Sequence, residues 1–188
     1  MGRRLLMLGP PGAGKGTQAR MLARAFGIPH ISTGELFRTA IAAGTELGKQ
    51  VEGILASGEL VPDDVTNAIV AERLEEPDVA CGYLTDGYPR TRAQAEAFRR
   101  TRGPAPDFDA VVLLDASEDV LVDRLLKRAA AEDRADDTED VIRRRFAVYR
   151  EQTEPLIDYY AHRDLILEVP GEGAIDEVFA AVVLALAG

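Results

Sequence analysis

A glycine-rich segment near the start of the chain has the residue types needed to hold phosphate. Residues 9–17 read Gly-Pro-Pro-Gly-Ala-Gly-Lys-Gly-Thr and fit the pattern G-x-x-x-x-G-K. Glycines let successive backbone N–H groups wrap around phosphate oxygens, and Lys15 adds a positive charge. The segment follows an apolar run at residues 4–8 and precedes a helical pattern that begins at Lys15. We therefore predict a phosphate-binding loop with these ligand-facing residues: Gly12, Ala13, Gly14, Lys15, Gly16 and Thr17.

The position after Lys15 departs from the usual loop. Gly16 stands where a Ser or Thr normally offers its hydroxyl to Mg²⁺, and Thr17 follows one position later. Direct and water-mediated binding of magnesium therefore both stay open. Asp86, at the end of an apolar run, is the carboxylate that we expect in the water shell of the metal.

The composition excludes several classes of protein. A chain of 188 residues with 46% hydrophobic and 29% charged residues predicts one globular domain with room for a small insertion. Its net charge of -10 argues against nucleic acid as a partner. Cys81 is the only cysteine, so no disulfide within the chain and no cysteine-built zinc site is expected. The apolar run at residues 4–8 is too short for a signal peptide or a membrane span, which favours the cytoplasm.

Short apolar runs alternate with longer helical patterns along the chain. We expect strands at residues 4–8, 30–32, 82–86, 110–115 and 165–169. We expect helices at residues 15–26, 35–43, 47–57, 63–75, 92–101, 118–130, 138–162 and 175–186. This alternation predicts an α/β fold with a five-stranded parallel sheet flanked by helices.

Polar segments follow each of the first four expected strands. The glycine loop follows the first, residues 32–34 the second, residues 86–90 the third and Asp115 the fourth. Because ligands bind beyond the carboxyl ends of parallel strands, these segments should meet at one crevice. A regulatory GTPase is excluded, since reading guanine needs the pattern N-K-x-D and the only asparagine, Asn67, is followed by Ala68. Small phosphoryl-transfer enzymes and nucleotide-binding modules without chemistry remain.

Nearly the whole chain resembles the nucleoside monophosphate kinases and, within them, the adenylate kinases of the short-lid type. The resemblance is carried by the glycine loop with Gln18, by residues 32–38, 58–62 and 86–90 with Gln94, and by the arginines of the second half. It implies the P-loop nucleoside monophosphate kinase fold. The core would take residues 1–31, 62–126 and 138–188, the monophosphate-binding insertion residues 32–61, and a short lid without zinc residues 127–137.

The same resemblance implies a reaction and its residues. The γ-phosphoryl of ATP would pass reversibly to AMP, giving two ADP, with Mg²⁺ as cofactor and a monomer as the active form. The implied ATP site comprises the glycine loop with Arg124, Arg128 and Gly173. The implied AMP site comprises Thr33, Arg38, Glu59, Leu60, Val61, Gly87, Tyr88, Pro89, Arg90, Gln94, Arg134 and Arg145. Lys15, Arg90, Arg128, Arg134 and Arg145 would be catalytic. Thr33 and Gln94 favour adenine, because relatives that prefer uracil or cytosine carry alanine and asparagine there.

Each of these assignments has a structural alternative. Residues 32–35 and 91–94 both read as helix capping boxes, so Gln94 could simply cap a helix. Residues 86–90 could form a turn with an exposed salt bridge, and Arg124 and Arg128 a solvated edge paired with Glu118 or Asp123. Arg145 lies beside an apolar seam of the helix at residues 138–162 and needs an anionic partner, either a ligand or a structural carboxylate.

The expected mechanism needs cations rather than a general base, since a phosphate oxygen is already ionised. The insertion and the lid should close before transfer to exclude water. His30 and His162 have no Ser or Cys beside them in a catalytic pattern, so neither is expected to act in catalysis or to bind metal. Two other functions stay open: a UMP/CMP or other small-metabolite kinase, and a nucleotide-binding regulator without catalysis.

Overall fold

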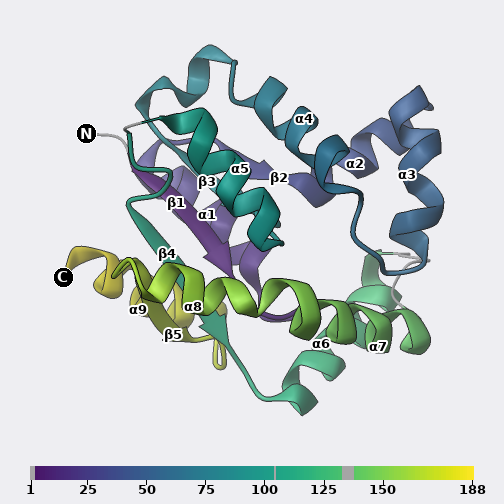
Figure 1. Ribbon diagram of the computed structural model, residues 1–188. Coiled ribbons are helices and arrows are strands. Elements are labelled where there is room, and N and C mark those ends of the chain that lie inside the picture. Colours follow the sequence, from purple (N-terminus) through teal and green to yellow (C-terminus); the bar gives the residue numbers. More distant parts are fainter. Residues whose placement is uncertain (1–2, 104, 133–137) are drawn as a thin grey trace.

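Five parallel strands form the centre of the molecule (Figure 1). A computed structural model describes residues 3–103, 105–132 and 138–188, and for residues 128–132 the backbone alone. The strands are β1 (Arg4–Leu8), β2 (His30–Ser32), β3 (Tyr83–Asp86), β4 (Ala110–Asp115) and β5 (Ile166–Pro170), in the spatial order β2-β3-β1-β4-β5. This arrangement confirms the α/β fold and the parallel sheet predicted from the sequence.

The helices occupy the stretches between the strands. They are α1 (Lys15–Phe26), α2 (Thr33–Ala42), α3 (Glu46–Ala56), α4 (Asp63–Arg73), α5 (Arg92–Arg102), α6 (Glu118–Glu132), α7 (Glu139–Val148), α8 (Pro155–Ala161) and α9 (Ile175–Ala187). A short 3₁₀ turn, η1 (Pro77–Cys81), precedes β3. No helix in these described ranges is long and apolar enough to cross a bilayer.

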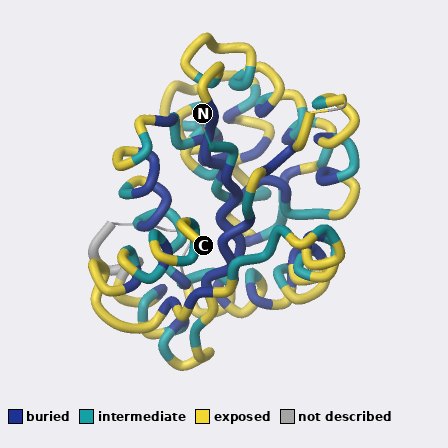
Figure 2. The backbone as a smooth tube through the Cα atoms, turned by 90° about the vertical axis from the view of Figure 1, so that its left-hand side faces the viewer, coloured by how far each residue is buried: buried dark blue, intermediate teal, exposed yellow. Residues whose placement is uncertain are grey.

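The central strand β1 sends alternate side chains to the two faces of the sheet, as period-2 geometry requires. Leu5 and Met7 pack in one buried cluster with residues of α1, α6 and α9. Leu6 and Leu8 pack in a second cluster with residues of α4, α5 and α8. Figure 2 shows the buried backbone gathered along the sheet, with exposed segments around it. Helices on both faces therefore hold the strand ends in fixed positions.

The helices α2 and α3 form a hairpin beside the edge strand β2 and have a small core of their own. Phe37, Val51 and Val61 make up its buried centre, separate from the two clusters on the sheet. The hairpin extends beyond the edge of the sheet at the right of Figure 1. Val65 and Ile69 of α4 pack against this core and connect it to the rest of the molecule.

The expectation of one helix over residues 138–162 is wrong in one detail. Between α7 and α8 lies a π-helical turn, η2 (Tyr149–Thr153), in which the N–H of Glu154 donates to the carbonyl of Tyr149 at 2.9 Å. Pro155 has no N–H to give to the carbonyl four residues earlier, and its ring clashes there, so the ladder widens before it. The buried seam survives the change, since Ile142, Phe146, Leu156 and Tyr160 are all buried.

Candidate active site

The glycine loop lies at the carboxyl end of β1 and packs tightly on its neighbours. Gly9 has φ +140°, and a Cβ atom there would lie 2.3 Å from the carbonyl oxygen of Leu114. Gly12 has φ +85°, and its Cβ atom would lie 2.6 Å from the carbonyl oxygen of Leu121. Both positions therefore require glycine, for their dihedral angles and for the close backbone approach.

Lys15 opens α1 and bends back over the loop. Its Nζ donates hydrogen bonds to the carbonyl oxygens of Gly9 and Pro10, each at 2.8 Å. The N-terminal N–H groups of α1 point into the same space and add the positive end of the helix dipole. An anion in the loop would therefore meet both the point charge of Lys15 and the donors of the helix N-terminus.

Asp86 ends β3 next to this loop. Burial raises the pKa of its carboxyl group, but His30, Lys15 and Arg90 lower it more, so the pKa lies below its ordinary value. Nε2 of His30 lies 3.7 Å from Oδ2 of Asp86. The carboxylate is thus ionised at neutral pH and surrounded by cationic groups.

The surroundings of Asp86 fit magnesium held through water. A Cβ atom built at Gly16 would lie 3.3 Å from Oδ2 of Asp86, so the missing side chain at Gly16 leaves space beside the carboxylate. Mg²⁺ prefers oxygen ligands and keeps several of its waters, and one ionised carboxylate with open space suits that preference. Among the described residues, no three His, Cys, Asp or Glu side chains come together to hold a metal ion.

Arginines from three separate elements converge beside Asp86. Arg90 follows β3, Arg38 belongs to α2 and Arg145 to α7. Burial lowers the pKa of the Arg90 guanidinium, and the charges of Arg145 and Arg38 lower it further against the attraction of Asp86. The packing around two glycines agrees with this: a Cβ atom at Gly87 would lie 2.8 Å from both Nη2 of Arg90 and Oγ1 of Thr33, and one at Gly34 would lie 3.1 Å from Nη1 of Arg38. The arrangement excludes the reading of residues 86–90 as an exposed turn, since neither Asp86 nor Arg90 is exposed.

The carbonyl of Gly87 ties this turn to the start of α2. It accepts hydrogen bonds from Oγ1 of Thr33 at 2.7 Å and from Nε of Arg90 at 3.0 Å. Tyr88 is buried, and its hydroxyl donates to Oδ1 of Asn67 at 2.7 Å. The residues predicted to border the monophosphate therefore meet at the carboxyl ends of β2 and β3.

Both ends of the Gln94 side chain have a partner within the protein. Its Oε1 accepts from the backbone N–H of Arg90 at 2.8 Å, and its Nε2 donates to Oδ1 of Asp63 at 2.7 Å. Oγ1 of Thr91 accepts from the backbone N–H of Gln94 at 3.1 Å and so caps α5. The Thr91 half of the predicted capping box is therefore present, whereas the Gln94 side chain binds the N–H of Arg90 and not that of Thr91. The amide has a second N–H on Nε2 and a second lone pair on Oε1 beyond these bonds.

Arg124 lies at the other side of the loop, near the end of β5. It donates to the carbonyl of Gly171 at 2.8 Å. The alternative partners are taken by others, since Asp123 pairs with Lys127 and Glu118 with Arg150, each at 2.6 Å. A Cβ atom at Gly171 would lie 3.2 Å from the carbonyl oxygen of Ala13. The segment before Gly173 therefore lies against the phosphate loop.

Two predicted catalytic residues fall on the segment that the structure describes least. Arg134 lies outside the described residues, and the backbone of Arg128 belongs to α6 while its side chain lies outside the described part. The other three predicted catalytic residues act on the same groups. Lys15 and Arg90 act on Asp86, and the charge of Arg145 acts on Arg90.

Three residues with a place at the site were not selected from the sequence. His30 lies beside Asp86, Asp63 holds Gln94 and Thr91, and Arg144 binds the predicted monophosphate-site residue Glu59. Asp63 and its partner Thr91 are 28 residues apart along the chain, and Arg144 and Glu59 are 85 residues apart. Only the strand order brings such distant residues together, and no local pattern indicates them.

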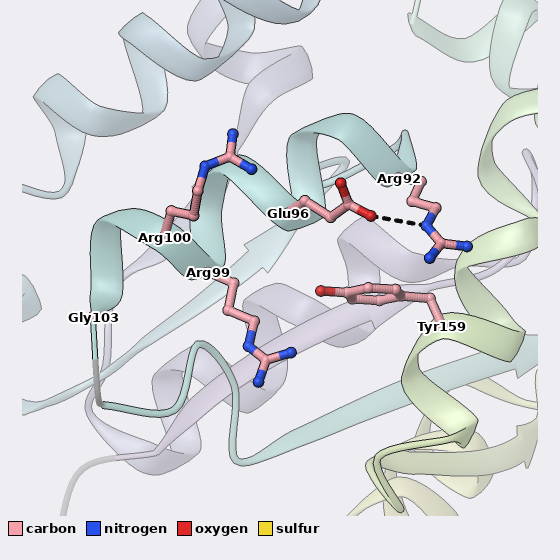
Figure 3. A pocket seen from close by; sticks show the side chains of 6 residues that line it. All are labelled: Arg92, Glu96, Arg99, Arg100, Gly103 and Tyr159. Atoms are coloured by element: carbon pink, nitrogen blue, oxygen red, sulfur yellow. Dashed lines mark hydrogen bonds and ion pairs between the residues drawn. The ribbon is translucent and has the colours of Figure 1, made fainter.

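A hollow on the surface lies away from these residues (Figure 3). It has a volume of about 510 Å³ and lies between α5 and Tyr159, with Arg99 and Arg100 at one end and Arg92 at the other. Nε of Arg92 is 2.9 Å from Oε1 of Glu96. None of the predicted site residues lines this hollow. A second hollow of about 470 Å³ lies at the carboxyl ends of β4 and β5, lined by Asp115, Ser117 and Glu172 among others.

A glycine loop at the end of a parallel strand, with cations gathered around it, defines the class of P-loop phosphotransferases. The comparisons with known proteins agree with this class. The family model described as adenylate kinase matches residues 7–165. The chain belongs to the adenylate kinase family.

Curated relatives match over nearly their whole length. An adenylate kinase of a Nocardioides species is 53% identical over 184 residues, covering 97% of this chain and 96% of the relative. One of Clavibacter michiganensis is 51% identical over 186 residues, covering 98% and 93% of the two chains. One of Stenotrophomonas maltophilia is 46% identical over 186 residues, covering 98% and 100%. These matches confirm the family resemblance and the class of nucleoside monophosphate kinase.

Proposed function

We propose that this chain carries out the reaction of its family, the reversible transfer of the γ-phosphoryl group of ATP to AMP, giving two ADP. The observation that carries the proposal is the gathering of cations at one end of the sheet: Lys15 and Arg90 act on Asp86, Arg90 and Thr33 meet on the carbonyl of Gly87, and the charges of Arg38 and Arg145 act on Arg90. Two polyanions repel each other, and positioned cations are the direct means of bringing them together. A nucleotide-binding regulator without chemistry has little use for such a set of cations.

The chemistry that these residues perform is positioning and charge stabilisation. The attacking phosphate oxygen is already ionised, so no side chain has to remove a proton. Lys15 and the backbone N–H groups of the loop hold the β- and γ-phosphates, and Arg38 and Arg90 hold the acceptor phosphate. Arg145, together with Arg128 and Arg134, stabilises the charge of the group in transfer. Mg²⁺ supplies further neutralisation of the β- and γ-phosphates when bound, with Asp86 in its water shell.

The two nucleotides occupy the two sides of the sheet end. ATP takes the glycine loop, with its base near Arg124 and Gly173. AMP takes the space between Thr33, the segment of residues 59–61 and the turn of residues 87–90. Gln94 supplies the base contact with the second N–H of Nε2 or the second lone pair of Oε1, while its bonds to Asp63 and Arg90 hold the amide in place.

The moving parts are the insertion at residues 32–61 and the short lid at residues 127–137. The separate small core around Phe37, Val51 and Val61 supports the first as a unit that can move as a whole. Both close over the nucleotides before transfer and thereby exclude water. We propose a monomer in the cytoplasm as the active form.

A panel of acceptors tests the proposal. The purified protein is incubated with Mg-ATP and with AMP, UMP, CMP or no acceptor, and nucleotide products are separated by chromatography. We expect two ADP formed for each pair of ATP and AMP, with AMP at least about tenfold better than the pyrimidine nucleotides. A preference for UMP or CMP would replace the substrate assignment. No ADP formation with any acceptor would leave a non-catalytic regulator.

A further inference from the structure

An ion pair links the end of the insertion to α7. Nε of Arg144 donates to Oε1 of Glu59 at 2.5 Å, across 85 residues of sequence. Both side chains remain partly open to solvent, at 48% for Arg144 and 37% for Glu59. The hydrogen bond to Glu59 is the main cause of the raised pKa of Arg144. Glu59 is part of the segment that borders the acceptor site in the proposed function.

Backbone packing beside this ion pair brings the same two elements together. Gly58 is buried, with φ +79°. A Cβ atom there would lie 3.1 Å from the carbonyl oxygen of Val141 and 3.2 Å from Cγ of Arg145. The turn after α3 therefore lies directly on α7. Val141 and Arg145, which Gly58 approaches, are one helical turn apart on α7.

Arg143, the preceding residue on α7, makes a different bond. It pairs with Glu139 of its own helix at 2.5 Å, and its side chain is 73% exposed. An ion pair between two residues of one helix does not hold that helix to another segment of the chain. Within the part of the chain that the structure describes, Arg144 bonds to the insertion, whereas Arg143 bonds to its own helix.

We propose that Arg144 is a positioning residue for the acceptor nucleotide. By holding Glu59, it sets the segment of residues 59–61 against α7 and so places that wall of the acceptor site beside Arg145. The side chain of Arg144 touches neither nucleotide. Because the pair is partly exposed, its strength falls with ionic strength. The inference rests on the proposed function, since it requires an acceptor bound at this wall.

The test compares Arg144→Ala with the matched control Arg143→Ala, which removes the same charge one position away. An exposed ion pair contributes enough to change an affinity by about two- to fivefold. We expect Arg144→Ala to raise KM for AMP by that factor, with KM for ATP and kcat at saturation within about twofold of the parent. Arg143→Ala should leave all three within about twofold, and Arg144→Lys should recover most of the loss.

Two further measurements separate positioning from a general effect. Raising the ionic strength from about 0.1 M to about 1 M should remove the difference between the parent and Arg144→Ala. The exchange variant Glu59→Arg with Arg144→Glu should bind AMP better than either single reversal, and all variants should unfold at similar temperatures. If Arg144→Ala and Arg143→Ala behave alike, or if the exchange variant recovers nothing, the proposal is overturned. Failure of the parent to use AMP at all would instead overturn the proposed function.

Discussion

Replacement of Arg90 by methionine should abolish catalysis while leaving the free protein nearly as stable as before. Methionine keeps an unbranched apolar side chain and removes the guanidinium. The protein loses one hydrogen bond from Nε to the carbonyl of Gly87, worth about 1–2 kcal/mol. It also loses the attraction between Arg90 and Asp86.

The opposing contributions are of similar size. Burial and the charges of Arg145 and Arg38 together lower the pKa of Arg90 in spite of Asp86, so the charged form is disfavoured in the folded protein. A base with a lowered folded pKa costs stability at every pH below that pKa, which includes neutral pH. Removing the charge recovers this cost. We therefore expect the free energy of unfolding to change by no more than about 1 kcal/mol, or about 2–4 °C in the melting temperature.

Activity should respond very differently. Loss of a cation that stabilises a phosphoryl group in transfer costs about 10³- to 10⁵-fold in kcat. Calorimetry gives the melting temperatures, and a coupled assay of ADP formation gives kcat. Arg92→Met serves as control, since Arg92 is an exposed residue of α5 that pairs with Glu96 at 2.9 Å. A loss of stability above about 3 kcal/mol, or kcat within about tenfold of the parent, would refute this account of Arg90.

Three other changes have expected outcomes. Gly12→Ala should destabilise the protein by about 2–3 kcal/mol and weaken ATP binding, because its φ is +85° and the new Cβ would lie 2.6 Å from a backbone oxygen. Gly53→Ala, in α3 with open space around it, should instead stabilise by about 0.5–1 kcal/mol, and both values follow from chemical unfolding. Arg163→Gln should cost about 3 kcal/mol at pH 7, because it leaves the buried Asp107 carboxylate without its ion pair. Arg163 lowers the pKa of Asp107 against the effect of burial, so this contribution is complete above the unfolded pKa of about 3.9 and disappears as the pH falls through the folded pKa. Unfolding measured from pH 7 down to about pH 1, which passes through the folded pKa, should therefore show the difference shrinking at the acidic end, and a constant difference would contradict the assignment.

Sequence patterns predicted those features that depend on neighbours along the chain. Residues 4–8 and 110–115 form strands whose continuous apolar runs are buried, as expected for parallel strands covered on both faces of a sheet. The glycine loop was predictable because its dihedral angles demand glycine at fixed spacing. The caps at Ser32 and Thr91 follow from side chains that reach an N–H three residues ahead. All of these are local causes.

What the sequence did not indicate depends on chain segments that meet only after folding. Asp63 looks like an ordinary surface carboxylate, yet it holds Gln94. Glu59 was placed at the monophosphate site by the family resemblance, but nothing in the sequence indicated its bond to Arg144. The π turn before Pro155 is an intermediate case. A proline inside a helical pattern signals a disturbance, but whether the helix ends, kinks or widens depends on the seam of Phe146 and Leu156 that must stay buried.

The small core of the insertion has a consequence for the energy landscape of the chain. Phe37, Val51 and Val61 bury far less apolar surface together than the two clusters that cover the sheet. Cooperative units with little buried surface open at lower free energy than the whole molecule. Amide hydrogens of α2 and α3 should accordingly exchange with deuterated solvent well before those of β1, and the hairpin would act as a separate foldon that can melt and re-form while the sheet stays native.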